Sequence, residues 1–265
     1  MSSSLSKNLQ HLVQTKTVAR GDRQRLTDEI YQHIIANSES ITRANFTSIS
    51  AADLGLLFQI NDELFFDGMV GRVCEEKAER PLSFRLSTRM TNAGGTTTMF
   101  RSGSRRKPKF EYEIAIATTP LFGTFSKQTG TGSSVVGGLP CQDRVQALQR
   151  IMEHEMIHLV EMLIWDDSNC QARPFKQIIK RFFGHTESNH QLLRPKDIAR
   201  QKLGIGVGDT VSFEHHGHQL TGMINRITKR ATILVADPNG VQYDDGKNYL
   251  TYYVPLGRLL SLIHI

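Results

Sequence analysis

The stretch IMEHEMIHLV, residues 151–160, contains His154, Glu155 and His158 in the order H-E-x-x-H. It lies in a longer segment, residues 142–165, whose apolar residues recur at helical spacing. Residues four apart share one face of a helix, so the two histidines can present their imidazoles to a single metal ion. Glu155 lies about 100° further around the helix, where it can touch a water held by the metal without ligating the ion. Zinc lowers the pKa of such a water toward about 7, which makes Glu155 a candidate general base for amide hydrolysis.

The same residues could instead occur by chance on an ordinary core helix, because H-E-x-x-H is a short motif. Burying two histidines and a glutamate without partners is unfavourable, however. The pattern therefore favours a metal site over a core helix.

A third ligand is required, and the sequence leaves its identity open. Cys170 lies in DDSNCQARPF, just before the next expected helix, where a returning chain can bring a ligand back. A buried structural thiol is the alternative for this residue. Glu161 lies on the same face of the helix as His154 but a turn beyond the metal. This position suits an exposed carboxylate, or a carboxylate that contacts a metal-ligating residue without reaching the metal itself. Other candidates downstream are His185, Glu187 and His190.

The pattern along the chain predicts an α+β fold. Residues 1–50 suggest a helical N-terminal extension of two helices separated near Gly21, and a stronger helix follows Ser50, a candidate cap with Asp53 three residues on. We then expect a three-stranded antiparallel sheet from residues 83–91, 96–100 and 110–120, a flexible Gly/Ser-rich loop at 123–138, and helices at 142–165 and 174–184. Residues 205–265 are rich in β-branched and aromatic residues between tight turns, which predicts a small all-β barrel.

Composition limits the classes of partner and the compartment that the chain suits. The chain has 32 lysines and arginines against 26 acidic residues, a mild excess that favours a polyanionic partner if the charges cluster. Its three cysteines, Cys74, Cys141 and Cys170, form no closed disulfide framework, and the first residues lack an apolar signal core. No stretch approaches the length of a membrane span. We expect a soluble, cytoplasmic protein with no membrane partner; its oligomeric state is left open.

Beyond the motif, the chain resembles the SprT-like (Spartan-type) zincin metallopeptidases. The segments FQINDELFFDG, STRMTNAGG, EIAIATTPLF and HEMIHLVEMLIW occur in that family's order across about half of the chain. The resemblance implies a zincin-like domain over residues 51–195, in which a helix and a sheet precede the metal-binding helix. It also implies that His154 and His158 ligate Zn²⁺ and that Glu155 is the catalytic base.

The chain departs from the family at the third ligand. The family usually supplies a histidine in an H-G-x-x-F pattern, and the matching stretch here is QARPF, residues 171–175. Either Cys170 replaces that histidine or His185 at the end of the next helix does so, and position favours Cys170. A thiolate donates more charge and makes zinc a weaker Lewis acid, so metal binding is better supported than peptidase activity.

Substrate binding can also be predicted by resemblance. In zincins an edge strand beside the metal helix pairs with an extended substrate, and FEYEIAIATTP is the candidate here. The neighbouring segment RSGSRRKPK carries Arg105, Arg106 and Lys107 between Arg101 and Lys109, which suits contacts with DNA phosphates. A solvated hairpin tip is the alternative.

The C-terminal module resembles KOW-like small barrels over a short stretch, where Arg226, Lys229 and Arg230 could line a binding face. His215, His216 and His218 fall at an expected hairpin tip and receive no role.

Three functions remain. The first is a zinc-dependent endopeptidase of SprT-like type that acts on DNA-associated or DNA-crosslinked proteins. The second is a catalytically weak nucleic-acid-binding protein with a structural zinc. A third possibility is a transcription or translation accessory that binds through residues 205–265.

Overall fold

The computed structural model describes residues 4–125, 132–188, 191–228 and 230–261. The chain divides into two compact units, Met1–Leu192 and Leu193–Ile265, and each is described by itself. Helices and small sheets are combined in one chain, so the expected α+β class is confirmed. None of the helices in the described ranges has the length and apolar composition that a membrane span requires.

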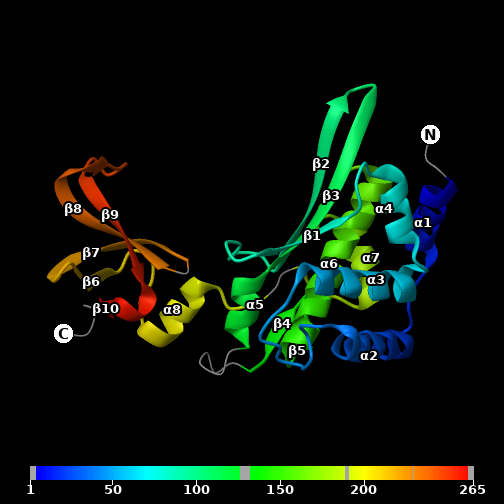
Figure 1. Cartoon of the computed structure of the whole chain (residues 1–265), viewed down its shortest axis with the longest axis horizontal. Coiled ribbons are helices and arrows are strands. Elements are labelled where there is room, and N and C mark those ends of the chain that lie inside the picture. The colour runs from blue at the N-terminus through cyan, green and yellow to red at the C-terminus, as the bar shows by residue number, and fades with distance from the viewer. Residues whose placement is uncertain (1–3, 126–131, 189–190, 229, 262–265) are drawn as a thin grey trace. The chain divides into compact units, whose positions relative to one another are not determined.

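The N-terminal unit is built around α6 (Figure 1). Its helices are α1 (Ser4–Thr15), α2 (Arg20–Asn37), α3 (Ala51–Phe66), α4 (Met69–Lys77), α5 (Thr118–Thr124), α6 (Arg144–Trp165) and α7 (Arg173–Phe183). Residues of α1 and α2, among them Leu9 and Ile30, are fully buried in the same apolar core as α6. The expected N-terminal extension therefore packs into this unit.

Local signals explain where the main helices begin and end. At α3, the Ser50 hydroxyl accepts from the amide of Asp53, whose carboxylate accepts from the amide of Ser50, the predicted capping box. At α6, the Asp143 side chain caps the first turn by accepting from Gln146. Helix α7 ends at Gly184, whose φ of 77° lies in the left-handed region that glycine adopts without strain.

The sheet beside α6 has the strand order β1-β3-β2. Its strands are β1 (Ser83–Ser87), β2 (Gly95–Ser104) and β3 (Lys107–Ala117). Strands β2 and β3 form an antiparallel hairpin, but β1 pairs with β3 in parallel. The expectation of a wholly antiparallel sheet is therefore wrong for β1, because β3 inserts between β1 and β2 and the turn at 92–95 does not pair them.

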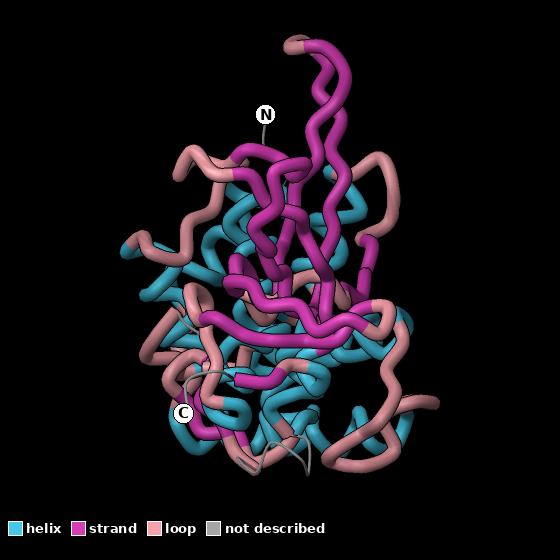
Figure 2. Tube along the Cα trace, turned by 90° about the vertical axis from the view of Figure 1, so that its left-hand side faces the viewer, coloured by secondary structure: helices cyan, strands magenta, loops and turns pink. Residues whose placement is uncertain are grey.

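This order changes which strand lies at the edge. Strand β3, which contains FEYEIAIA, is paired on both sides from Glu113 to Ala117, so the expectation that this strand is the free edge of the sheet is wrong. Strand β2 lies at the edge and packs against α6. The β2–β3 hairpin extends well beyond the helices of its unit (Figure 1, Figure 2).

Part of the expected loop at 123–138 is ordered. Strands β4 (Ser134–Val136) and β5 (Leu139–Cys141) form a small hairpin, and the segment after α7 bonds to it through the amide of Thr186 and the carbonyl of Gly137. Gly137 has a φ of 60° and the Nδ1 atom of His185 lies against it, so no side chain fits there. Residues 126–131 of the expected loop lie outside the described residues.

The C-terminal unit contains one helix and a curled sheet. Its elements are α8 (Pro195–Leu203), β6 (Thr210–His215), β7 (His218–Ile227), β8 (Arg230–Gln242), β9 (Asn248–Pro255), the 3₁₀ turn η1 (Leu256–Arg258) and β10 (Leu260–Ser261). The strands are antiparallel in the order β10-β6-β7-β8-β9, and the four longer ones form a half-barrel around Phe213, Ile224 and Ile233. The expected barrel is thus present as an open half-barrel.

Candidate metal centre

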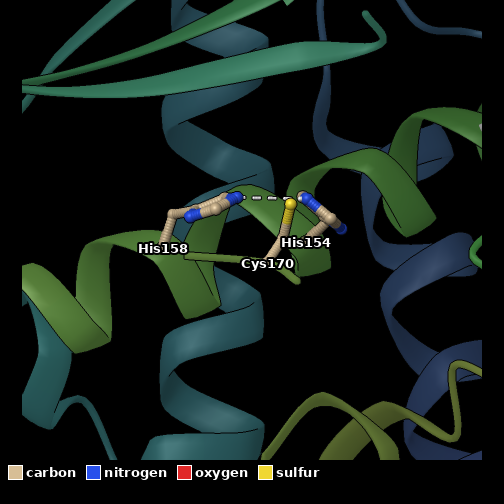
Figure 3. A group of neighbouring side chains, drawn as sticks. All are labelled: His154, His158 and Cys170. Carbon is tan, nitrogen blue, oxygen red and sulfur yellow. Dashed lines mark hydrogen bonds between the residues drawn. The ribbon is translucent and has the colours of Figure 1, made fainter. Parts of the chain in front are cut away.

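Three side chains of the N-terminal unit converge at one point. His154 and His158 extend from consecutive turns of α6, and Cys170 comes from the loop between α6 and α7 (Figure 3). The donor atoms of the three residues all lie within 4.8 Å of one another, and no other group of this kind occurs among the described residues. We call His154, His158 and Cys170 the three-donor group; it could bind a metal ion.

The distance between the two imidazoles fits a tetrahedral metal. The Nε2 atoms of His154 and His158 lie 3.2 Å apart. Two nitrogens that each lie about 2.0–2.1 Å from one zinc ion at a tetrahedral angle are about 3.3 Å apart. Two imidazoles and a thiol also form a donor set that zinc accepts readily. The residues present therefore fit zinc.

Phe175 packs against both imidazole rings. It lies in the first turn of α7, is fully buried, and its ring centroid lies 4.9 Å from that of His154 and 4.6 Å from that of His158. Burial also lowers the pKa of His158 to about 4, so this imidazole is neutral at pH 7. Neutral imidazole is the form that ligates metals.

A series of hydrogen bonds leads from His158 away from the three-donor group. Its Nδ1 atom lies 2.7 Å from the hydroxyl oxygen of Ser168, and that hydroxyl donates to Oε2 of Glu161 over 2.6 Å. The amide of Asn169 donates to the same carboxylate oxygen over 3.3 Å. Burial raises the pKa of Glu161, and the bonds from Ser168 and Asn169 oppose that rise. Glu161 thus lies outside the three-donor group, as expected, and contacts His158 indirectly through Ser168.

Glu155 is enclosed between α6 and β2. Its side chain is buried, and the Thr97 hydroxyl lies 2.9 Å from its Oε2 atom and 2.9 Å from its carbonyl oxygen. A Cβ atom at Gly95 would lie only 2.8 Å from Oε1 of Glu155, so the start of β2 leaves just enough space for this carboxylate. Burial raises the pKa of Glu155 to about 8. A bound divalent cation would lower it again, because an opposite charge favours the carboxylate.

His185 is engaged elsewhere. It is buried, and its Nε2 atom lies 2.7 Å from the carboxylate of Glu153, which also accepts from Arg150 at 2.7 Å. Of the two candidates for the third ligand, the structure thus brings Cys170 to the histidines and leaves His185 in this buried ionic cluster. Glu187 is exposed, and His190 lies outside the described residues.

The basic segment lies at the end of the β2–β3 hairpin. Arg105 and Arg106 form the turn and Lys107 begins β3; all three are exposed and pair with no acidic side chain in the described ranges. We call these three residues the basic tip. The flanking charges are partly engaged, since Lys109 pairs with Glu79 at 2.9 Å and Arg101 lies over the ring of Phe110.

In the C-terminal unit, the histidines lie at the expected hairpin tip. His215 and His218 pair across β6 and β7, and His216 adopts a left-handed turn conformation with a φ of 50°. These three described histidines do not form a metal-binding group. Arg226 and Arg230 are exposed, whereas Lys229 lies outside the described residues.

Sequence reasoning missed three residues of the site. Gly95 and Thr97 carry no recognisable signal, because their role depends on β2 lying beside α6. Ser168 carries a weak one, since it is a hydroxyl residue in the short polar segment that leads to Cys170.

Comparisons of the chain with models of known protein families, with curated proteins and with solved structures found no match.

Proposed function

We propose that this chain is a zinc-dependent endopeptidase of the SprT-like type that acts on proteins associated with or crosslinked to DNA. The observation that carries the proposal is the convergence of His154, His158 and Cys170 on one point, with Glu155 buried next to the first ligand. Structural zinc sites almost always have four protein ligands, whereas catalytic ones have three and keep one position open. Three donors are found among the described residues, which supports the catalytic arrangement.

The proposed chemistry divides between the metal and the chain. When bound, zinc polarises a carbonyl oxygen and makes a water molecule more acidic. Glu155 takes the proton from the attacking water and delivers it to the leaving amine. Thr97 keeps the Glu155 carboxylate on the side of β2 through its hydroxyl. Phe175, which is fully buried, packs against both imidazole rings and limits their contact with bulk water.

Substrate selection is proposed to depend on backbone pairing and on DNA. Strand β2 is the edge strand beside α6, so an extended peptide can pair with it independently of its sequence. Such pairing is unselective, and the basic tip at the end of the same hairpin would restrict cleavage to proteins held on DNA.

The test is the Glu155→Gln variant of the full chain, loaded with zinc and given DNA and casein. The unmodified chain should cleave casein or itself. The variant should lose this activity and keep one zinc per chain, because glutamine fills the same space without accepting a proton. Glu63→Gln, an exposed glutamate of α3, is the control and should remain active. An unmodified chain that binds zinc and DNA but cleaves neither protein would refute the peptidase.

The second function, a nucleic-acid-binding protein with a structural zinc, is favoured by one observation. The third donor is a cysteine, and thiolates are frequent ligands of structural zinc. Under this alternative, removing zinc should unfold the N-terminal unit, and no fourth position should be open to exchangeable water. Zinc-dependent unfolding without cleavage would support it.

A further inference from the structure

We propose that Glu161 and Ser168 are positioning residues of the metal centre, which set the tautomer of His158 and hold the loop that carries Cys170. The proposal deepens the zinc site of the proposed function and does not depend on peptidase activity. The hydrogen bonds that lead away from the three-donor group are its basis.

The protons along these hydrogen bonds can be counted. The Ser168 hydroxyl has one proton, and it lies between two partners, Glu161 at 2.6 Å and His158 Nδ1 at 2.7 Å. The Glu161 oxygen also accepts from the amide of Asn169, so it is an acceptor for two donors. Since Ser168 gives its proton to this oxygen, its own oxygen can only accept from His158. Nδ1 of His158 therefore carries a proton.

The chemistry of imidazole then determines the nitrogen that is free to ligate. A neutral imidazole carries one ring proton, so a proton on Nδ1 leaves a lone pair on Nε2. The Nε2 atom of His158 is the one that lies 3.2 Å from Nε2 of His154 and beside Cys170 (Figure 3). The hydrogen bonds that run from Glu161 through Ser168 thus leave Nε2 of His158 free to ligate the metal.

The same carboxylate also restrains the loop between α6 and α7. Asn169, whose amide is bound by Glu161, is the residue immediately before Cys170. One buried carboxylate on α6 therefore restrains both the second histidine and the thiol, although those two ligands come from different segments. Loss of an outer partner of this kind typically weakens metal binding about 10–100-fold.

The first measurement uses the metal-free full chain with ¹⁵N-labelled histidine. Long-range ¹H–¹⁵N correlation spectra distinguish the two imidazole tautomers, and His158 should be protonated on Nδ1. In Ser168→Ala this preference should be lost, while Ser168→Thr, which keeps the hydroxyl, should retain it. A His158 protonated on Nε2 in the unmodified chain would overturn the proposal.

The second measurement is zinc affinity by competition with a chromophoric chelator. Ser168→Ala and Glu161→Gln should each weaken binding by about tenfold or more, and Ser168→Thr should restore most of it. The double variant should bind zinc no more weakly than Glu161→Gln alone, because the contact of Ser168 with His158 is oriented by Glu161. The control is Ser188→Ala, which removes a hydroxyl that contacts Gln171 and touches neither Glu161 nor His158.

Unchanged zinc affinity in both Ser168→Ala and Glu161→Gln would also overturn the proposal, as would strictly additive losses in the double variant. Should Glu161→Gln fail to fold, the comparison of Ser168→Ala with Ser168→Thr still tests the proposal through the His158 tautomer and the zinc affinity. A chain that shows the tautomer and the affinity losses but cleaves nothing would refute the peptidase and leave this inference intact.

Discussion

At the scale of single residues, the space around Glu155 is defined by the start of β2. Thr97 binds the carboxylate and Gly95 lies against it, so the side chain has no room to rotate toward the strand. Neither contact can be predicted from the sequence, since both residues are far from Glu155 along the chain. The spacing of His154, Glu155 and His158, by contrast, is local and predicts which residues share the site.

Replacing Gly95 with alanine tests this confinement. The new methyl group would lie 2.8 Å from Oε1 and 2.9 Å from Cγ of Glu155, closer than such atoms approach, so the carboxylate must move. We expect cleavage to fall by about tenfold or more, since small displacements of a catalytic group are costly. Zinc content should be unchanged.

The matched control is Gly55→Ala in α3, where a Cβ atom would meet only Phe84 at an ordinary 3.6 Å. It should leave activity intact and stabilise the helix slightly. Full activity of Gly95→Ala would show that Glu155 is not confined as described.

At the scale of elements, a buried ionic cluster fixes α6 to the segment that follows α7. Glu153 has no exposed surface and binds both Arg150 and His185 at 2.7 Å. Burial alone would raise the pKa of Glu153, but the charge of Arg150 and the bond from His185 outweigh it and hold that pKa below its usual range. The carboxylate therefore stabilises the fold in its charged form.

Glu153→Gln should lower the free energy of unfolding at pH 7 by about 3–5 kcal/mol, because the largely buried guanidinium of Arg150 loses its charged partner. Since the pKa of Glu153 is lower in the folded than in the unfolded state, its contribution is complete above the ordinary pKa of glutamate. It is lost as the pH falls through the folded pKa.

Urea unfolding of the metal-free chain checks both the loss at pH 7 and its pH dependence, when it is measured from pH 7 down to about pH 2, well below the ordinary pKa of glutamate. The unmodified chain should lose stability over the acidic part of this range, and the variant should lose less. Glu63→Gln, an exposed control, should stay within about 0.5 kcal/mol of the unmodified chain throughout. Equal acid sensitivity of the Glu153 variant and the unmodified chain would contradict the assigned role.

Helices were more predictable than strand order for a physical reason. Caps such as Ser50 with Asp53 and the apolar spacing of α6 are local, so the sequence specifies them directly. The parallel pairing of β1 with β3 depends on contacts between distant segments, and alternation within a strand does not reveal its neighbours. The choice between Cys170 and His185 could not be resolved from sequence for the same reason.

At the scale of the whole molecule, positive charge is available on both units. The basic tip extends from the N-terminal unit, while Arg226 and Arg230 are exposed on the C-terminal half-barrel. The formal net charge of +6 does not by itself say which of these surfaces binds a polyanion.

Alanine at Arg105, Arg106 and Lys107 together should weaken DNA binding, because three exposed charges at one projecting point can each neutralise a phosphate. The slope of binding against salt concentration should fall by about one for each phosphate that the variant no longer neutralises. Fluorescence anisotropy with a labelled duplex, recorded over a range of salt, measures both effects in the full chain.

Two variants with altered charge elsewhere serve as comparisons. Alanine at Lys7, Arg20 and Lys176 removes an equal number of positive charges from exposed sites on helices. It should leave the slope of DNA binding against salt nearly unchanged. Alanine at Arg226 and Arg230 tests the half-barrel. A larger loss from that pair than from the basic tip would assign DNA binding to the C-terminal unit.

The central claim is that His154, His158 and Cys170 bind one zinc ion with a position left for water. X-ray absorption at the zinc edge of the full chain tests it most directly. We predict one sulfur at about 2.3 Å together with nitrogen or oxygen ligands at about 2.0–2.1 Å, in a four-coordinate site. The sulfur should disappear in Cys170→Ser. A site without sulfur in the unmodified chain, or a chain that retains no zinc, would contradict the account.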